Sequence, residues 1–449
     1  MGINRNASST GIALLRARFV SYCSDIRGSY WFVPSLGVVA GILAAYFAIL
    51  QDRNGIVESH YMFWLRETSP AGARALLSTL AGAIITVAGV SFSITIVALT
   101  LASSQFGPRL LRNFMRDGGN QFVLATFLST FAYSMVVLRS IQDNAFVFVP
   151  HLAIAMASGL ALFNVVVLIY FIHHIASTIS ASHVIKSVSQ ELDQTIDRLH
   201  PNSLATKAKQ PNCDVSFDSA DCVRATSSGY IQVLDIAGLL KIADTKHWAI
   251  KIESRPGQFV TRDTPLAQIV RQKKSKALAE SDIELVNSAI ILGASRTPEQ
   301  DVEFLIHQLV EVALRALSPG INDPFTALDC IDRLGEALIK LTQRQLSPTT
   351  YSDDDNTPLL ILKPTTFAGL ADAAFDQLRQ YGCSSMAVSL RMLEVIALII
   401  PFAQRDEDLV ILAKHAKMIS KSCASQHKEE HDQADLKTRN DNIEKLLDQ

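Results

Sequence analysis

The chain lacks the sequence motifs that mark the common enzyme classes. It contains no Gly-x-Ser-x-Gly nucleophile turn, no phosphate-binding P-loop, no His-Glu-x-x-His zinc motif and no dinucleotide-binding glycine fingerprint. The sequence therefore predicts no catalytic residue, no cofactor and no metal ligand. Because the same chemistry recurs on unrelated folds, a new kind of membrane enzyme stays open as the least favoured interpretation.

Charge is also scarce and unevenly spread along the chain. Charged residues make up 19% and hydrophobic residues 49% of the 449 residues. The chain is apolar up to about residue 175, and from about residue 186 onward it has the composition of a soluble protein. The net charge of −2 offers no electrostatic attraction to nucleic acid, so we expect no nucleic-acid partner.

Long apolar runs predict a four-helix transmembrane domain over residues 31–175, with the lipid bilayer as its surroundings. A hydrocarbon core of roughly 30 Å is crossed by about 20 helical residues. No Ala-x-Ala-like cleavage site follows the first run, so we interpret it as a retained span rather than a signal peptide. The predicted spans are residues 31–50, 76–103, 122–138 and 152–175.

The positive charges around these spans predict their orientation. Seven arginines lie in the N-terminal segment 1–30 and in the loop between spans two and three, against four in the other two loops. The side with the excess is expected to be cytoplasmic, which places both termini inside. All six cysteines then face a reducing compartment, and none forms a Cys-x-x-Cys pair.

Span two carries a stripe of small or hydroxylated residues. Their spacing of three, four or seven puts them on one helix face. The favoured interpretation is close helix packing, and the alternative is a water-lining face of an oligomeric pore. No Asp, Glu, Lys, Arg or His lies in the middle of any span, which favours packing because an ion relay usually needs such a residue. The stripe consists of Ser78, Gly82, Thr86, Gly89, Ser93 and Thr100.

The remainder is predicted to be an α+β region. Apolar residues spaced by three or four over 176–200, such as Ile185, Val188 and Leu192, predict a helical stalk that continues span four. A polar linker follows over 201–219. Short alternating runs between glycines and prolines predict a small β unit over 220–272. Residues 273–449 are expected to form a mostly helical domain.

Two capping patterns are expected to begin helices in this last domain. Thr297, Pro298 and Gln300 have the spacing of a capping box. In the segment "RALSPGINDPF", Gly320 is expected to end one helix with a positive φ, and Asp323 to cap the next. The favoured interpretation of this segment is a structural corner. The alternative is a site for a small anionic ligand formed by Arg315, Gly320, Asn322 and Asp323.

Three long stretches carry a family resemblance: "SFSITIVALTLASSQFGPRLLRNFMRD", "SRTPEQDVEFLIHQLVEVALRALSPGINDPFTALDCIDRL" and "AFDQLRQYG". They resemble the bacterial inner-membrane family designated domain of unknown function 2254 (DUF2254), over almost the whole chain. The resemblance implies a four-span membrane region with a cytoplasmic C-terminal part. It implies no reaction, substrate or catalytic residue.

Two hypotheses of different class follow. In the first, the protein is a homo-oligomeric channel or transport-like component whose span two lines or seals a central path and whose cytoplasmic region regulates it. In the second, it is a membrane-anchored sensor or scaffold whose spans only anchor a ligand-binding region. The length and small-residue stripe of span two favour the first slightly, whereas the missing intramembrane charge favours the second.

Overall fold

The computed structural model forms two compact units, Met1–Ser180 and Ala181–Gln449, which are described separately. The predicted N-terminal segment 1–30 and most of the linker 201–219 lie outside the described residues. The structure describes residues 31–54, 69–107, 117–143, 147–178, 180–200, 216–218, 220–271, 278–346, 350–352 and 357–448.

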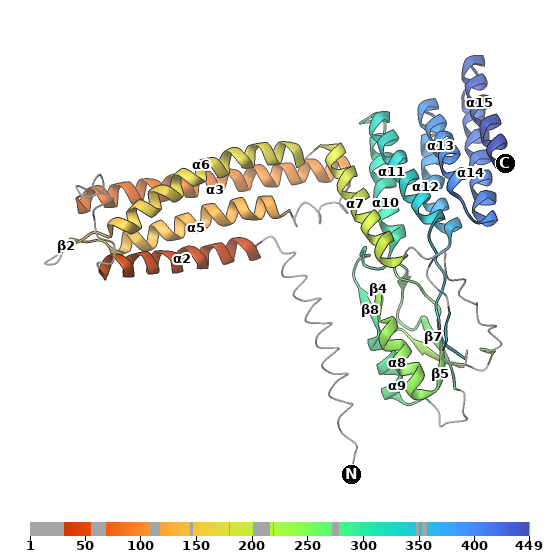
Figure 1. The fold of residues 1–449 in the computed structure, drawn as a ribbon, viewed down its shortest axis with the longest axis horizontal. Coiled ribbons are helices and arrows are strands. Elements are labelled where there is room, and N and C mark those ends of the chain that lie inside the picture. Colours follow the sequence, from red (N-terminus) through yellow and green to blue (C-terminus); the bar gives the residue numbers. More distant parts are fainter. Residues whose placement is uncertain are drawn as a thin grey trace, which may run out of the picture. The chain divides into compact units, whose positions relative to one another are not determined.

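The first unit contains four helices that are long and apolar enough to cross a membrane, which confirms the four predicted spans. They lie side by side in Figure 1, and α5 contacts each of the other three. A short hairpin, β1 (Gln142–Asp143) with β2 (Val147–Phe148), precedes the last helix. The helices are α2 (Phe32–Arg53), α3 (Pro70–Phe106), α5 (Gly118–Ser140) and α6 (His151–Thr178).

Close packing in this bundle depends on a glycine of α2. A Cβ atom added at Gly41 would lie 2.4 Å from the backbone oxygen of Ser129 on α5. The bundle core comprises two apolar clusters. We call them cluster A, with Ala45, Ala48, Ile49, Ala73, Leu77, Tyr133, Val137, Ile141, Ala153, Ile154 and Ala157, and cluster B, with Ile84, Ala88, Val123, Phe127, Val167 and Phe171.

The second unit begins with α7 (Ala181–Leu199), whose apolar side is buried at Ile185, Val188 and Leu192, as the spacing predicts. Helix α7 is separate from α6, which ends at Thr178, and it packs on α10 and α11. It is therefore part of the helical layer of the second unit. The other helices of this layer are α10 (Val302–Ala316), α11 (Pro324–Thr342), α12 (Phe367–Gly382), α13 (Met386–Ile399), α14 (Asp406–Gln426) and α15 (Glu430–Leu447).

The β region lies at one end of this helical layer (Figure 1) and is larger than predicted. A five-stranded sheet has the order β3-β7-β5-β10-β9, and a three-stranded sheet the order β6-β4-β8. Strands β8, β9 and β10 come from beyond residue 272, so the predicted boundary is wrong. Its elements are β3 (Asp221–Arg224), β4 (Gly229–Leu234), α8 (Ile236–Lys246), β5 (Trp248–Ile252), β6 (Phe259–Val260), β7 (Pro265–Arg271), α9 (Glu280–Ser288), β8 (Ile290–Gly293), β9 (Thr350–Ser352) and β10 (Pro358–Ile361).

The predicted helix start at Thr297 is also wrong. Helix α10 begins at Val302, and its N-cap is Asp301, whose carboxylate accepts a hydrogen bond of 3.1 Å from the amide of Phe304. Gln300 does not complete a capping box. Its side chain instead bonds both the amide and the carbonyl of Leu234, at 2.9 and 3.1 Å, and so holds the preceding turn against the end of β4.

Candidate functional site

The segment "SPGINDPF" forms the corner between α10 and α11. As predicted, Asp323 caps α11, accepting from the amide of Thr326 at 3.2 Å and from its hydroxyl at 2.6 Å. These hydrogen bonds from Thr326 lower the pKa of the Asp323 carboxyl. The expected positive φ at Gly320 is wrong, because the left-handed residue of the turn is Asn322, with φ 52°. Asparagine tolerates that conformation because its side chain is short and polar.

The backbone donors of this corner are used within the turn. The amides of Ile321 and Asn322 donate to the carbonyl of Ser318 at 3.0 and 2.9 Å, and the amide of Asp323 donates to Ala316 at 2.8 Å. These groups are therefore not directed at an anion. Arg315 lies half-buried in the last turn of α10. The geometry favours the structural corner over the anion site.

The small-residue stripe of span two does not pack inside the bundle. All six of its residues are exposed, and a Cβ added at Gly82 or Gly89 would meet nothing within 4 Å. The hydroxyl of Thr86 donates to the carbonyl of Gly82 at 2.8 Å, and that of Ser93 to Gly89 at 2.9 Å. Helix α3 packs through another face, which includes Ala73, Leu77, Ala81, Ile84, Ala88 and Ser91.

A cavity of about 400 Å³ opens in the second unit where the β region meets α7 and α10. Its walls come from segments far apart in the chain, which is why no local motif predicts it. Apolar surface is provided by Leu234, Ile236, Tyr351 and Leu362, and charged groups by Arg198, Arg255, Asp301, Glu303 and Lys363.

A network of alternating charges underlies this cavity. The Arg296 guanidinium binds the carboxylate of Asp301 at 2.7 and 2.8 Å, and Arg255 pairs with Glu303. Arg296 also lies 3.9 Å from Glu303, which joins the two pairs. The turn at Gly257 has φ 87°, and a Cβ there would lie 2.0 Å from Asp301. Only glycine fits there, because another residue would displace the capping carboxylate.

Burial shifts the pKa of two groups around the cavity. Desolvation raises the pKa of the Asp301 carboxyl, although the charge of Arg296 opposes this shift. Burial lowers the pKa of His200 to about 4, so its imidazole is neutral at pH 7. Lys363 is exposed and makes no hydrogen bond or ion pair with the residues that the structure describes. The cavity thus combines apolar walls, acids that are paired with arginines, and the charge of Lys363, which is available to a ligand.

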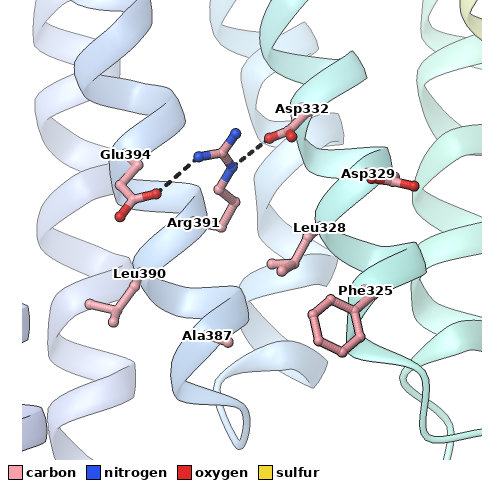
Figure 2. Close-up of a pocket in the computed structure, with 8 residues that line it drawn as sticks. All are labelled: Phe325, Leu328, Asp329, Asp332, Ala387, Leu390, Arg391 and Glu394. Atoms are coloured by element: carbon pink, nitrogen blue, oxygen red, sulfur yellow. Dashed lines mark hydrogen bonds and ion pairs between the residues drawn. The ribbon is translucent and has the colours of Figure 1, made fainter.

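A second hollow, a groove of about 440 Å³, runs between α11 and α13 (Figure 2). Arg391 lies between Asp332 and Glu394, at 2.6 and 3.0 Å, so its charge is already paired. Phe325 at the other end of the groove is 76% exposed. The groove offers neither a nucleophile with an adjacent base nor an unpaired cation.

Within the described residues, Asp372, Asp376 and His415 are close enough to hold a metal ion, with ligand atoms within 4.8 Å of one another. Their charges already have partners. Lys414 lies 3.6 Å from Asp372, and Arg379 lies 3.5 Å from Asp376. The buried His415 bonds Asp372 at 3.0 Å. This cluster is explained as an ion-pair network between α12 and α14.

Four apolar helices followed by a helix-rich region with small sheets define a multi-span membrane protein. The chain belongs to the DUF2254 family of predicted membrane proteins, whose model matches residues 27–397. It is 31% identical to a protein of Mycobacterium bovis and to one of Mycobacterium tuberculosis strain H37Rv, both described as uncharacterized. Each match spans 378 residues, or 83% of this chain and 72% of the relative. No solved structure matches the chain.

Proposed function

We propose that the protein is a homo-oligomeric channel or transport-like component of the bacterial inner membrane, in which the α3 helices of several copies meet through the small-residue stripe. The observation that carries this proposal is the outward direction of the stripe. At about 100° per residue, the stripe lies roughly opposite the face of α3 that packs in the bundle. A partner for it must therefore come from outside the bundle.

A second copy of the chain fits this stripe better than lipid does. Small residues let two helix backbones approach closely, and such faces are enriched where membrane helices pack together. The hydroxyls of Thr86 and Ser93 also present a face that water can wet. Helix α3, with 37 residues, is about 55 Å long, so a shared axis of α3 helices would extend beyond a hydrocarbon core of roughly 30 Å.

Cysteine accessibility in liposomes tests this proposal. Thr86→Cys and Ser93→Cys, in a cysteine-free background, are expected to react with small aqueous thiol reagents and to change solute flux when modified. Ile94→Cys is the matched control, because Ile94 is also exposed on α3 but lies outside the stripe. Absence of reaction at both stripe positions would favour a protein that is only anchored by its spans.

The cavity of the second unit supports a related role, the binding of a small anionic ligand that regulates the membrane region. Lys363 offers an unpaired charge to an anion, while Leu234, Ile236 and Tyr351 offer apolar contact. Thermal stability of the full-length protein across a panel of phosphate and nucleotides is the test. A stabilising anion should lose its effect in Lys363→Gln but keep it in Lys445→Gln, a change of an exposed lysine on α15.

A further inference from the structure

The core of the membrane bundle contains a polar side chain with no partner. Asn164 lies in the middle of α6 and is 5% exposed. Neither its amide nitrogen nor its amide oxygen has a hydrogen-bond partner among the described residues. The hydroxyl of Ser134 on α5, which is 0% exposed, has none either. The side chains of Asn164 and Ser134 are therefore left without hydrogen-bond partners inside the described part of the bundle.

Asn164 lies between the two apolar clusters of the bundle. Along the buried face of α6, Ala157 belongs to cluster A and Val167 to cluster B, with Asn164 between them. On α5, the buried Thr130 lies between Phe127 of cluster B and Tyr133 of cluster A. Because α5 packs against α6, both helices become polar at the same level.

The third helix contributes a small residue at this level. Ala81, a small and buried residue, lies on α3 between Leu77 of cluster A and Ile84 of cluster B. We call the level formed by Ala81, Thr130 and Asn164, with Ser134 one turn further along α5, the polar layer. It divides the apolar core near the middle of the spans.

An unpaired amide in a bundle surrounded by hydrocarbon destabilises the fold, because no bulk water reaches it. A partner that satisfies Asn164 must accept a hydrogen bond from the amide nitrogen and donate one to the amide oxygen. A bare metal cation cannot accept from the nitrogen, and a simple anion cannot donate to the oxygen. Water does both, and buried water binds where several polar groups converge.

We propose that the polar layer is a binding site for water, which accepts a hydrogen bond from the amide nitrogen of Asn164 and donates one to its amide oxygen. This site lies inside each bundle and does not depend on the α3 stripe. Its existence can therefore be tested separately from the proposed oligomeric path.

Nuclear magnetic resonance of the full-length protein in detergent, with ¹⁵N-labelled asparagine, tests the site. The side-chain amide protons of Asn164 are expected to show magnetisation transfer from water, whereas the ring protons of Phe171 in cluster B are not. Asn164→Leu assigns the signal by its loss, and Asn164→Ser does so if the leucine variant does not fold. An assigned Asn164 amide without water transfer would overturn the proposal.

Discussion

At the scale of single residues, the turn at Gly257 determines how the charged network of the cavity is held. Its φ of 87° and the 2.0 Å approach of Asp301 to an added Cβ both exclude larger residues. Gly320 differs in both respects, since its φ is not positive and nothing lies within 4 Å of an added Cβ. The two glycines are therefore a matched pair for a test of backbone strain.

Gly257→Ala should lower the free energy of unfolding by about 1–3 kcal/mol, because a strained φ and a displaced carboxylate both destabilise the native state. Gly320→Ala should change it by no more than about 0.5 kcal/mol. Thermal unfolding of the two variants in detergent is the measurement. Equal stability of the two would show that the Gly257 turn relaxes without cost.

His200 gives the second unit a predictable response to acid. Burial lowers the pKa of His200 to about 4 from its ordinary value of 6.5, so the unfolded chain binds a proton that the native state rejects between those values. Stability should therefore fall as the pH drops through this window, by about 2 kcal/mol between pH 7 and pH 5.

The response is measured as the change in unfolding temperature between pH 7 and pH 5. His200→Gln should remove part of that change, because glutamine does not titrate. His431→Gln, which changes a histidine that is exposed on α15, is the control. An identical response in all three proteins would assign the acid sensitivity to other groups.

At the scale of elements, the contact between α2 and α5 depends on Gly41. A Cβ there would lie 2.4 Å from the backbone oxygen and 2.7 Å from the hydroxyl of Ser129, and backbone cannot move aside cheaply. Gly41→Ala should therefore destabilise the bundle by roughly 1–3 kcal/mol. Gly159→Ala, where nothing lies within 4 Å, should not. Melting temperatures in detergent distinguish the two, and a Gly41→Ala variant as stable as Gly159→Ala would contradict the close packing.

Elements that form from local signals could be predicted from the sequence, and elements that need distant partners could not. The four spans are continuous apolar runs, and Asp323 caps the helix directly after it. The start of α10 was predicted too early because Gln300 bonds Leu234, 66 residues away. Strand β10 has no local signal of its own, because it pairs in parallel with β5, which lies far back in the chain.

The candidate site was less predictable than the fold. The cavity combines short pieces of α7, β4, α10 and the segment after β10, none of which has a motif of its own. The sequence does not single out Asn164, because asparagine carries no charge and its burial depends on how α6 packs in the bundle. Only the stripe on α3 could be read from spacing, and the spacing could not say that it faces outward.

At the scale of the whole molecule, the distribution of arginines predicts that both termini are cytoplasmic. Single cysteines at Ser59 and Asn144, in the loops after spans one and three, should be labelled from outside intact cells in a cysteine-free background. Cysteines at Asp117 and Ser219 should stay protected. Labelling at Ser219 from outside would contradict this orientation. It would mean that the cavity of the second unit lies outside the cytoplasm.

The proposed association through the stripe predicts that the oligomeric state depends on its small residues. Leucine side chains at Gly82 and Gly89 would fill space that is open in the single bundle and would hold neighbouring α3 helices apart. Neither change is expected to unfold the bundle, because neither position packs inside it.

Native mass spectrometry of the detergent-purified protein tests this association directly. The wild type and Ile94→Leu are expected to have the same multiple of the 49.1 kDa chain mass, and Gly82→Leu/Gly89→Leu to have the mass of a single chain. A wild type that is itself a single chain, or a double variant that keeps the wild-type mass, would contradict assembly through α3.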